Sequence, residues 1–222
     1  MNDILELELV IGLGIRRKIY KITKRIFDVL FGIIGIIFLV PVTIILKICY
    51  MLTGDFHRII FTQERIGLNG KTFKFYKFRS MVPNADEVLF KLLKKNKRLA
   101  KEYRINKKLK NDPRITKIGK IIRKTSIDEL PQLINIFKGD MSLIGNRPYL
   151  PREKDDMGDS FNEIVKTKPG LTGWWQVGGR SNNTFEERLN MEKYYSNHAG
   201  FRLDLKIFIK TFKVVFKCDG AE

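Results

Sequence analysis

The most pronounced pattern in the chain is an apolar run near its N-terminus. From Val29 to Leu46 almost every residue is aliphatic or aromatic, and Thr43 and two glycines are the mildest interruptions. A straight helix needs about 20 apolar residues to cross the hydrocarbon core of a bilayer, so this run is marginal for that purpose. Pro41 lies within the run and Lys47 follows it. The pattern therefore predicts a membrane segment that is not a simple spanning helix.

Basic residues flank this run on both sides. The sequence "RRKIYKITKR" precedes it, and Lys47, Arg58 and Arg65 follow it. Basic flanks mark the cytoplasmic side of a membrane segment, and here both flanks qualify. A re-entrant helix, broken at Pro41 and leaving by the face it entered, would place both flanks on that side. The alternative is an ordinary spanning helix that Pro41 only kinks.

The remaining pattern predicts short strands and several helices. "FTQERIGLNGKTFKFYKFRSM" alternates as two strands joined at Asn69-Gly70, a dipeptide typical of hairpin turns. "NADEVLFKLLKKNKRLAKEYRINKKLK" predicts a charged amphipathic helix, either solvated or interfacial, and "FRLDLKIFIKTFKVVFKC" predicts another helix near the end. We expect an α+β, mostly helical fold with an N-terminal re-entrant membrane helix-break-helix, a short hairpin and interfacial amphipathic helices.

These patterns divide the chain into three parts. Residues 1–23 form a basic, amphipathic N-terminal segment, residues 24–52 the membrane helix bent at Pro41, and residues 53–222 a cytosolic domain. Forty-two Lys and Arg against 24 Asp and Glu give a formal charge of +18. Such a surface attracts polyanions, which include nucleic acid, anionic lipid headgroups and phosphorylated substrates. Basicity alone does not choose among them.

The stretch "RKTSIDELPQL" contains an adjacent pair of acids, Asp128 and Glu129. Ser126 and Glu129 match a capping box, and Pro131 suits the first positions of a helix. In the structural interpretation, the two acids only complement the dipole of that helix.

A functional interpretation starts from the same acids. Arg123 and Lys124 favour the ionised form of a carboxylate close to them. An ionised Asp128 can act as a nucleophile toward phosphorus. Glu129 beside it can hold Mg²⁺ on the phosphate oxygens.

Several long motifs make a family resemblance specific. "KFRSM", "SIDELPQLINIFKGDMSLIGNRP" and "KPGLTGWWQVGGR" follow the basic-flanked apolar segment in this order. This order resembles the bacterial sugar transferase family, the monotopic polyprenyl-phosphate phosphoglycosyltransferases, from about Lys24 to Phe216. The resemblance implies transfer of a sugar 1-phosphate from a UDP-sugar to polyprenyl (undecaprenyl) phosphate through a covalent aspartyl-phosphosugar, with release of UMP. It places the reaction at the first membrane step of exopolysaccharide, capsule or glycoconjugate synthesis.

The resemblance also implies roles for individual residues. Asp128 matches the family nucleophile and Glu129 its Mg²⁺ ligand. The substrate-binding positions that it implies are Lys77, Arg79, Arg123, Arg147, Gln176 and Arg180. Four positions depart from the family pattern: Asn146 replaces a proline before Arg147, Glu192 and His198 replace an Asp and an Asn, and Val40 replaces a Ser before Pro41.

The implied setting is the bacterial cytoplasmic (inner) membrane, with the catalytic domain on the cytosolic face. The implied partners are a UDP-sugar donor, a polyprenyl phosphate acceptor and membrane lipid, with Mg²⁺ as cofactor and no nucleic acid. The motifs leave the sugar open among galactose, glucose and N-acetylated amino sugars, and they leave a homodimer open. The competing hypothesis is a non-enzymatic basic membrane-surface module that binds anionic lipid or nucleic acid, in which Asp128 and Glu129 are caps.

Overall fold

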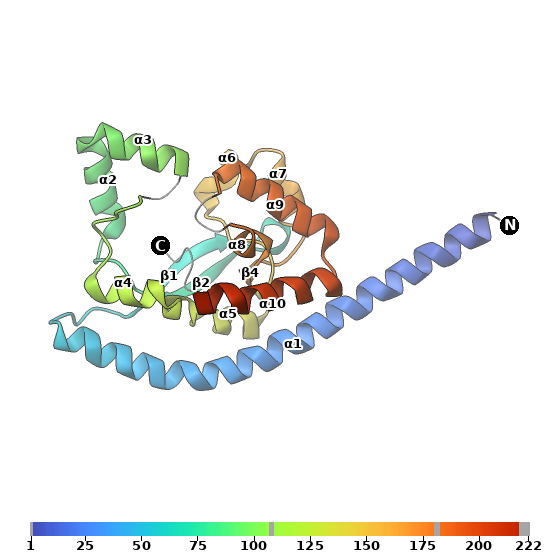
Figure 1. The fold of residues 1–222 in the computed structure, drawn as a ribbon, viewed down its shortest axis with the longest axis horizontal. Coiled ribbons are helices and arrows are strands. Elements are labelled where there is room, and N and C mark those ends of the chain that lie inside the picture. The colour runs from blue at the N-terminus through green and yellow to red at the C-terminus, as the bar shows by residue number, and fades with distance from the viewer. Residues whose placement is uncertain (1, 107–108, 180–182, 218–222) are drawn as a thin grey trace.

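One long helix, α1 (Asn2–Leu52), contains the whole apolar run and its preceding basic flank. It belongs to a computed structural model that describes residues 2–106, 109–179 and 183–217. Figure 1 shows α1 as a curved helix along one side of the rest of the chain, with its concave side toward the other elements. The part of α1 from Gly14 to Leu52 is long and apolar enough to cross a membrane, and little of it is buried.

Pro41 lies inside α1 without ending it, so the predicted break in the helix at this residue is wrong. Proline removes one backbone donor and crowds the carbonyl four residues earlier, while the turns on either side keep their own hydrogen bonds. Two residues further on, Thr43 Oγ1 donates to the Leu39 carbonyl at 2.7 Å. The result is a gentle curve around the domain, as helices that wrap a core commonly show.

The predicted hairpin is confirmed. Strands β1 (Ile60–Ile66) and β2 (Thr72–Phe78) pair antiparallel. They are joined by the short helix η1 (Leu68–Gly70), in which Asn69 and Gly70 have φ values of 55° and 77°. Positive φ is accessible to Asn and Gly at little cost, which explains why the turn forms at this dipeptide.

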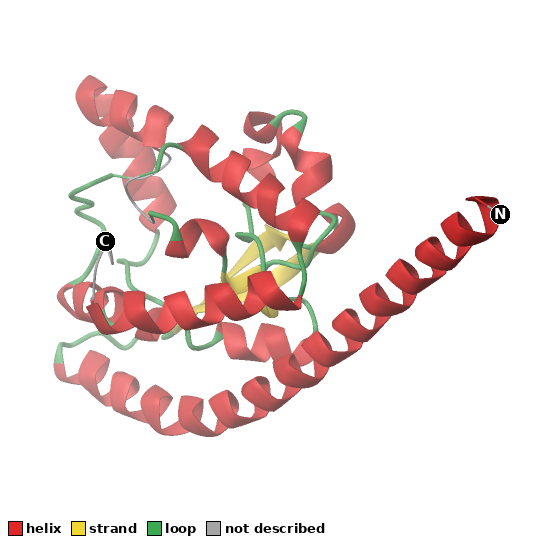
Figure 2. Ribbon diagram, turned by 45° about the vertical axis from the view of Figure 1, so that its right-hand side comes forward, coloured by secondary structure: helices red, strands yellow, loops and turns green. Residues whose placement is uncertain are grey.

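The charged segment after the hairpin forms two helices where one was predicted. α2 (Ala85–Lys95) and α3 (Lys97–Asn106) are separated by Asn96, whose backbone is extended at φ −129° and ψ 99°. Figures 1 and 2 show this pair as an arm that projects from the molecule on the side away from α1. The arm therefore faces away from the apolar surface of α1.

The remainder is mostly helical, as predicted. A second sheet pairs β3 (Ser142–Ile144) with β4 (Gly170–Thr172) in parallel, and β3 is followed by the loop that carries Arg147. The other elements are α4 (Lys117–Lys124), η2 (Ile127–Glu129), α5 (Gln132–Lys138), η3 (Pro151–Glu153), α6 (Lys154–Met157), α7 (Ser160–Ile164), α8 (Trp174–Val177), α9 (Phe185–His198) and α10 (Phe201–Lys217).

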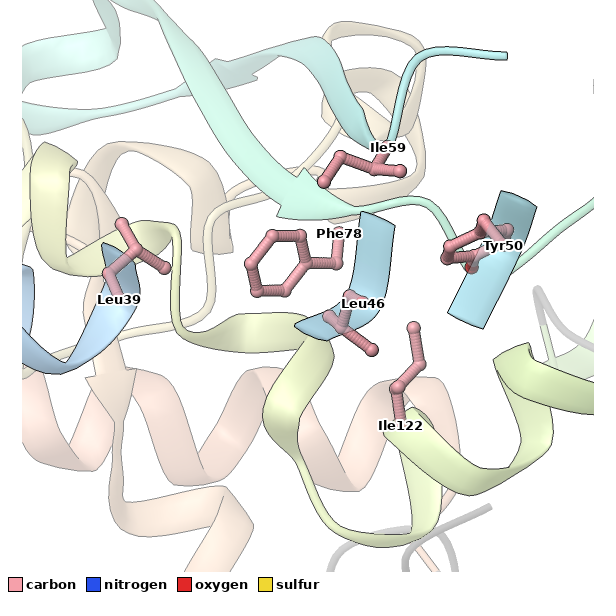
Figure 3. Packing of buried hydrophobic residues seen from close by; sticks show 6 residues of the cluster. All are labelled: Leu39, Leu46, Tyr50, Ile59, Phe78 and Ile122. Carbon is pink, nitrogen blue, oxygen red and sulfur yellow. The ribbon is translucent and has the colours of Figure 1, made fainter. Parts of the chain in front are cut away.

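The C-terminal half of α1 is part of the domain core. Figure 3 shows side chains from α1, the hairpin and α4 packed together, and the cluster consists of Leu39, Leu46, Tyr50, Ile59, Phe78 and Ile122. The Tyr50 hydroxyl also donates to the carbonyl of Arg79, just after β2. Burying such side chains stabilises the fold by about 2 kcal/mol each. The same helix thus supplies an exposed apolar face and part of the core.

Polar contacts attach the preceding part of α1 to the same domain. Lys24 Nζ lies 2.5 Å from Asp204 Oδ2, and the Tyr20 hydroxyl donates to the same oxygen at 2.8 Å. One turn further along, Asp28 accepts hydrogen bonds from Ser142 Oγ and from the Leu143 N–H at 3.0 and 2.7 Å. The domain therefore contacts α1 from Tyr20 to Tyr50.

Candidate active site

The two adjacent acids lie on a short turn between α4 and α5. Asp128 and Glu129 belong to η2, and α5 begins only at Gln132. Ser126 has a left-handed backbone with φ 57°, and its side chain makes no capping hydrogen bond, so the predicted capping box is wrong. Instead, the Glu129 N–H donates a hydrogen bond to the Ser126 carbonyl, and this bond closes the turn. The capping box therefore does not explain the acid pair, which still lies just before the start of α5, and Pro131 precedes α5 as expected.

Lys77 joins the two carboxylates. Asp128 is 2% exposed, and its Oδ2 atom lies 2.7 Å from Lys77 Nζ, an ion pair without hydrogen-bond alignment. The same Nζ atom is 3.6 Å from Glu129 Oε1, and the Glu129 side chain is 41% exposed. One carboxylate is thus buried and held by the lysine, while the other reaches solvent beside it. This is a compact site with one ammonium and two carboxylates.

Arg123 approaches this group from α4. Its Nε atom donates to Ser80 Oγ at 2.8 Å, which fixes the side chain next to the end of β2. Burial lowers the pKa of Arg123, and the nearby charge of Asp128 acts in the opposite direction. The structure therefore brings four predicted residues together: Lys77, Arg123, Asp128 and Glu129.

Arg79, another predicted substrate-binding residue, makes its contacts within the protein. Its guanidinium is buried and donates to the carbonyls of Arg58 and Met81, at 2.9 and 3.2 Å, and to Asp55 at 2.9 Å. It also lies over the Tyr50 ring at 4.8 Å. These contacts tie the end of α1 to the hairpin, and the predicted substrate contact of Arg79 stays a prediction.

Arg147 lies in a loop that its neighbour anchors. The buried Asn146 amide lies within hydrogen-bond distance of the Ile164 carbonyl, Thr167 Oγ1 and Ser196 Oγ, at 3.0, 3.1 and 2.7 Å. These contacts connect the loop to α7 and α9. Asn146, which replaces the family proline, is therefore a fixed point of the loop.

Arg147 and Gln176 lie in a second group, around Trp175. The Arg147 guanidinium is 5.4 Å from the centre of the Trp175 ring. Gln176 Nε2 donates to the Leu171 carbonyl at 3.4 Å, and its Oε1 atom is buried without a hydrogen-bond partner. Arg180, the remaining predicted residue, lies outside the described residues.

Three residues of this second group were not predicted as site residues. Arg188 lies over the same Trp175 ring at 5.0 Å, and Arg65 approaches from β1. Glu192 accepts a hydrogen bond from the Arg147 N–H at 3.1 Å, and burial raises its pKa to about 8. Arg188 and Glu192 are four residues apart on α9, a spacing that places them on one helix face. That spacing was the sequence signal, but many solvated helices show it as well.

The carboxylate pair suits a Mg²⁺ ion that is shared with a substrate. Within the described part of the chain, no group of three or more His, Cys, Asp and Glu side chains could hold a metal ion. Mg²⁺ in phosphate-transferring sites is commonly bound through one or two carboxylates plus substrate phosphates, and it does not need a full protein cage. The exposed Glu129 beside Asp128 fits that requirement.

Comparison with known proteins identifies a family. A family model described as bacterial sugar transferase matches residues 19–218. The chain is 42% identical over 208 residues to the undecaprenyl-phosphate galactose phosphotransferase of Salmonella typhimurium, covering 94% of this chain and 43% of that protein. It is 39% identical over 208 residues to the exopolysaccharide production protein ExoY of Sinorhizobium fredii, covering 94% of this chain and 92% of that protein.

A more distant relative has a related name. The chain is 32% identical over 203 residues to the UDP-glucose:undecaprenyl-phosphate glucose-1-phosphate transferase of Escherichia coli, covering 87% of this chain and 40% of that protein. The chain therefore spans less than half the length of the Salmonella and Escherichia proteins, and nearly all of the length of ExoY.

Proposed function

Because the chain belongs to the bacterial sugar transferase family, we propose that it transfers a sugar 1-phosphate from a UDP-sugar to polyprenyl phosphate. Two relatives bear names that describe phosphotransfer of this kind to undecaprenyl phosphate, and another is named for exopolysaccharide production. The observation that carries the proposal is the buried Asp128, paired with Lys77 on a short turn before α5.

The reaction follows from the chemistry of these residues. A carboxylate oxygen of Asp128 attacks the sugar-bearing phosphorus of the donor, and the bond to the other phosphate breaks, so that UMP leaves with the electron pair. The sugar 1-phosphate is now bound to Asp128 as an acyl phosphate. A phosphate oxygen of the polyprenyl acceptor then attacks the same phosphorus, and the carboxylate is restored. Lys77 and Arg123 offset the negative charge of the phosphates during both steps.

Glu129 is the residue that would hold Mg²⁺. Bound there, the ion would offset charge on the phosphate oxygens that are rearranged. Lys77 already lies between the two carboxylates, so the protein supplies positive charge at the same place. The Mg²⁺ requirement is part of this proposal.

We further propose that α1 is re-entrant, with both of its ends on the cytosolic side of the inner membrane. The domain contacts α1 from Tyr20 to Tyr50, a length of about 45 Å. That length exceeds the ~30 Å hydrocarbon core, so a perpendicular crossing would bring polar groups of the domain into lipid. The curve of α1 allows a shallow path that needs no break at Pro41. The face turned from the domain carries exposed apolar residues: Ile26, Leu30, Ile33, Ile37, Ile44 and Ile48.

Among the amphipathic helices, α10 is the best candidate for an interfacial helix. Phe31 of α1 and Phe208 of α10 are in edge-to-face contact at 5.8 Å, so α10 lies beside the membrane helix. Its exposed apolar residues recur at helical spacing and are Phe201, Leu205, Ile209 and Phe212. The α2–α3 arm lies on the side away from α1, which supports a solvated position for it.

The test of the reaction is an assay of the purified chain with UDP-galactose, UDP-glucose and UDP-N-acetylglucosamine. With Mg²⁺ and polyprenyl phosphate, we expect one donor to give UMP and a lipid-linked sugar diphosphate, and we expect a chelator to stop both. If no donor gives UMP while the protein binds anionic vesicles, the non-enzymatic membrane-surface module is the better description.

The test of topology is cysteine labelling at Lys18 and Thr53, one position at a time, in a chain without its native cysteines. Both positions flank the apolar run. A membrane-impermeant maleimide should label both from the cytosolic side only. Labelling of the two positions from opposite sides would show a spanning helix and would contradict the re-entrant path.

A further inference from the structure

The two groups of side chains described above lie along one face of the β1–β2 hairpin. Residues at alternate positions of a strand share a face, and so do directly opposed residues of paired strands. Lys77 and Phe75 therefore share a face with Arg65, which pairs with Phe73. The Arg65 guanidinium lies 5.2 Å from the centre of the Phe75 ring. Phe75 is two residues before Lys77 on β2, a rise of about 7 Å. A single small molecule can therefore contact both groups.

The second group, around Trp175, carries more positive than negative charge. Arg65, Arg147 and Arg188 are close enough for their charges to oppose one another, and burial lowers the pKa of Arg65 and of Arg188. The nearby carboxylates are Glu153, which accepts a hydrogen bond from the Leu150 N–H at 2.7 Å, and the buried Glu192. Within the described residues, none of the three arginines forms an ion pair with a carboxylate.

Arg188, like Arg65 and Arg147, has a buried Nε atom without a hydrogen-bond partner. Its side chain is buried, and the residue is 8% exposed. A capping box at Thr184 fixes the first turn of α9 and hence the place of Arg188. The Trp175 ring supports its guanidinium at 5.0 Å. A buried donor without a partner is costly, so a ligand oxygen that accepts from this donor would stabilise the arrangement.

We propose that Arg188 is a further donor-binding residue, which together with Arg147 and Arg65 holds the nucleotide half of the donor, the part that leaves as a nucleoside monophosphate. Guanidinium groups present several donors in a plane and suit phosphate oxygens. The sugar-bearing phosphate would lie at Asp128, and the nucleotide would extend along the hairpin face toward Trp175. This inference rests on the proposed function and adds to it the residue Arg188 and the direction of the donor.

The test measures binding of UMP, which needs no turnover. Titration calorimetry on the full chain should show that Arg188→Gln weakens UMP binding between about tenfold and 100-fold. Arg188→Lys keeps the charge and the stem but loses the planar fork, so it should retain the fold and bind UMP with intermediate affinity. Arg152→Gln is the matched control, because Arg152 is exposed but close enough to affect Arg65. It should change UMP affinity less than twofold.

Several outcomes overturn the inference. One is wild-type UMP affinity in Arg188→Gln, and another is an equal loss in Arg152→Gln, which would show only diffuse attraction. If Arg188→Gln does not fold, Arg188→Lys with wild-type affinity overturns it as well.

The outcomes also separate this inference from the proposed function. Normal turnover of a UDP-sugar with an unchanged KM in Arg188→Gln would leave the function standing and remove the role of Arg188. UMP binding that depends on Arg188, in a protein that turns over no UDP-sugar, would support the site and contradict the reaction.

Discussion

Asp128→Asn is expected to reduce UMP release from a UDP-sugar by at least about 10³-fold, because an amide oxygen cannot replace a carboxylate as the nucleophile. The substitution keeps the shape of a side chain that is 3% exposed, so the fold should persist. Removing the charge leaves Lys77 without its closest partner at 2.7 Å, and some loss of stability is expected. The measurements are the initial rate of UMP formation and mass spectrometry of the protein after incubation with donor alone.

The matched control is Asp140→Asn. Asp140 also lies near a lysine, with its Oδ2 atom 3.5 Å from Lys138 Nζ, but outside the Asp128 site. Turnover within about twofold of wild type is expected for Asp140→Asn, since substitutions away from the core and the active site usually have small effects. A phosphosugar adduct should form on the wild-type protein and be absent from Asp128→Asn. Turnover by Asp128→Asn within tenfold of wild type would rule out Asp128 as the nucleophile.

Gly119→Ala is expected to have the largest effect on stability. Gly119 is in the first turn of α4, and a methyl group there would overlap the Ser80 backbone carbonyl. Backbone cannot move aside as a flexible side chain can, so α4 must shift from the end of β2. Overpacking of this kind costs about 3 kcal/mol, which lowers the melting temperature by roughly 6–12 °C for a chain of this size. Thermal unfolding in detergent measures this change.

The same substitution should also reduce activity. Arg123 on α4 reaches Ser80 at 2.8 Å, so displacement of α4 separates Arg123 from the carboxylates. Gly200→Ala is the control, because a methyl group at Gly200 meets only the His198 carbonyl at an ordinary 3.8 Å. A melting temperature for Gly119→Ala equal to that of Gly200→Ala would contradict the close approach of α4 to β2.

The hairpin and the acid pair could be predicted because their signals are local. Asn69-Gly70 specifies a turn within a few residues, and the family motifs around Asp128 stand in continuous stretches of sequence. Lys77 and Arg123 come from different elements, and the motifs predicted both as site residues. The structure then brought both of them to Asp128.

The failures arose where several local rules competed. Ser126 and Glu129 fit a capping box, but the backbone forms a separate short turn before α5, so the acids face Lys77. Pro41 commonly ends helices, yet packing of α1 on both sides of it holds the helix together. Arg188 could not be singled out, because it lies over the ring of Trp175 on α8. The sequence alone does not show that α8 and α9 come together there. Tertiary contacts decide each of these cases.

The packing of α1 connects the placement of the long apolar helix to the geometry of the candidate site. Leu39, Leu46 and Tyr50 complete a cluster that also contains Phe78 and Ile122, next to the end of β2 and to α4. Those two elements carry Lys77 and Arg123. A chain that has not yet placed α1 against the domain therefore lacks part of the support for the candidate site. Removing α1 to obtain a shorter protein would remove one wall of this core as well.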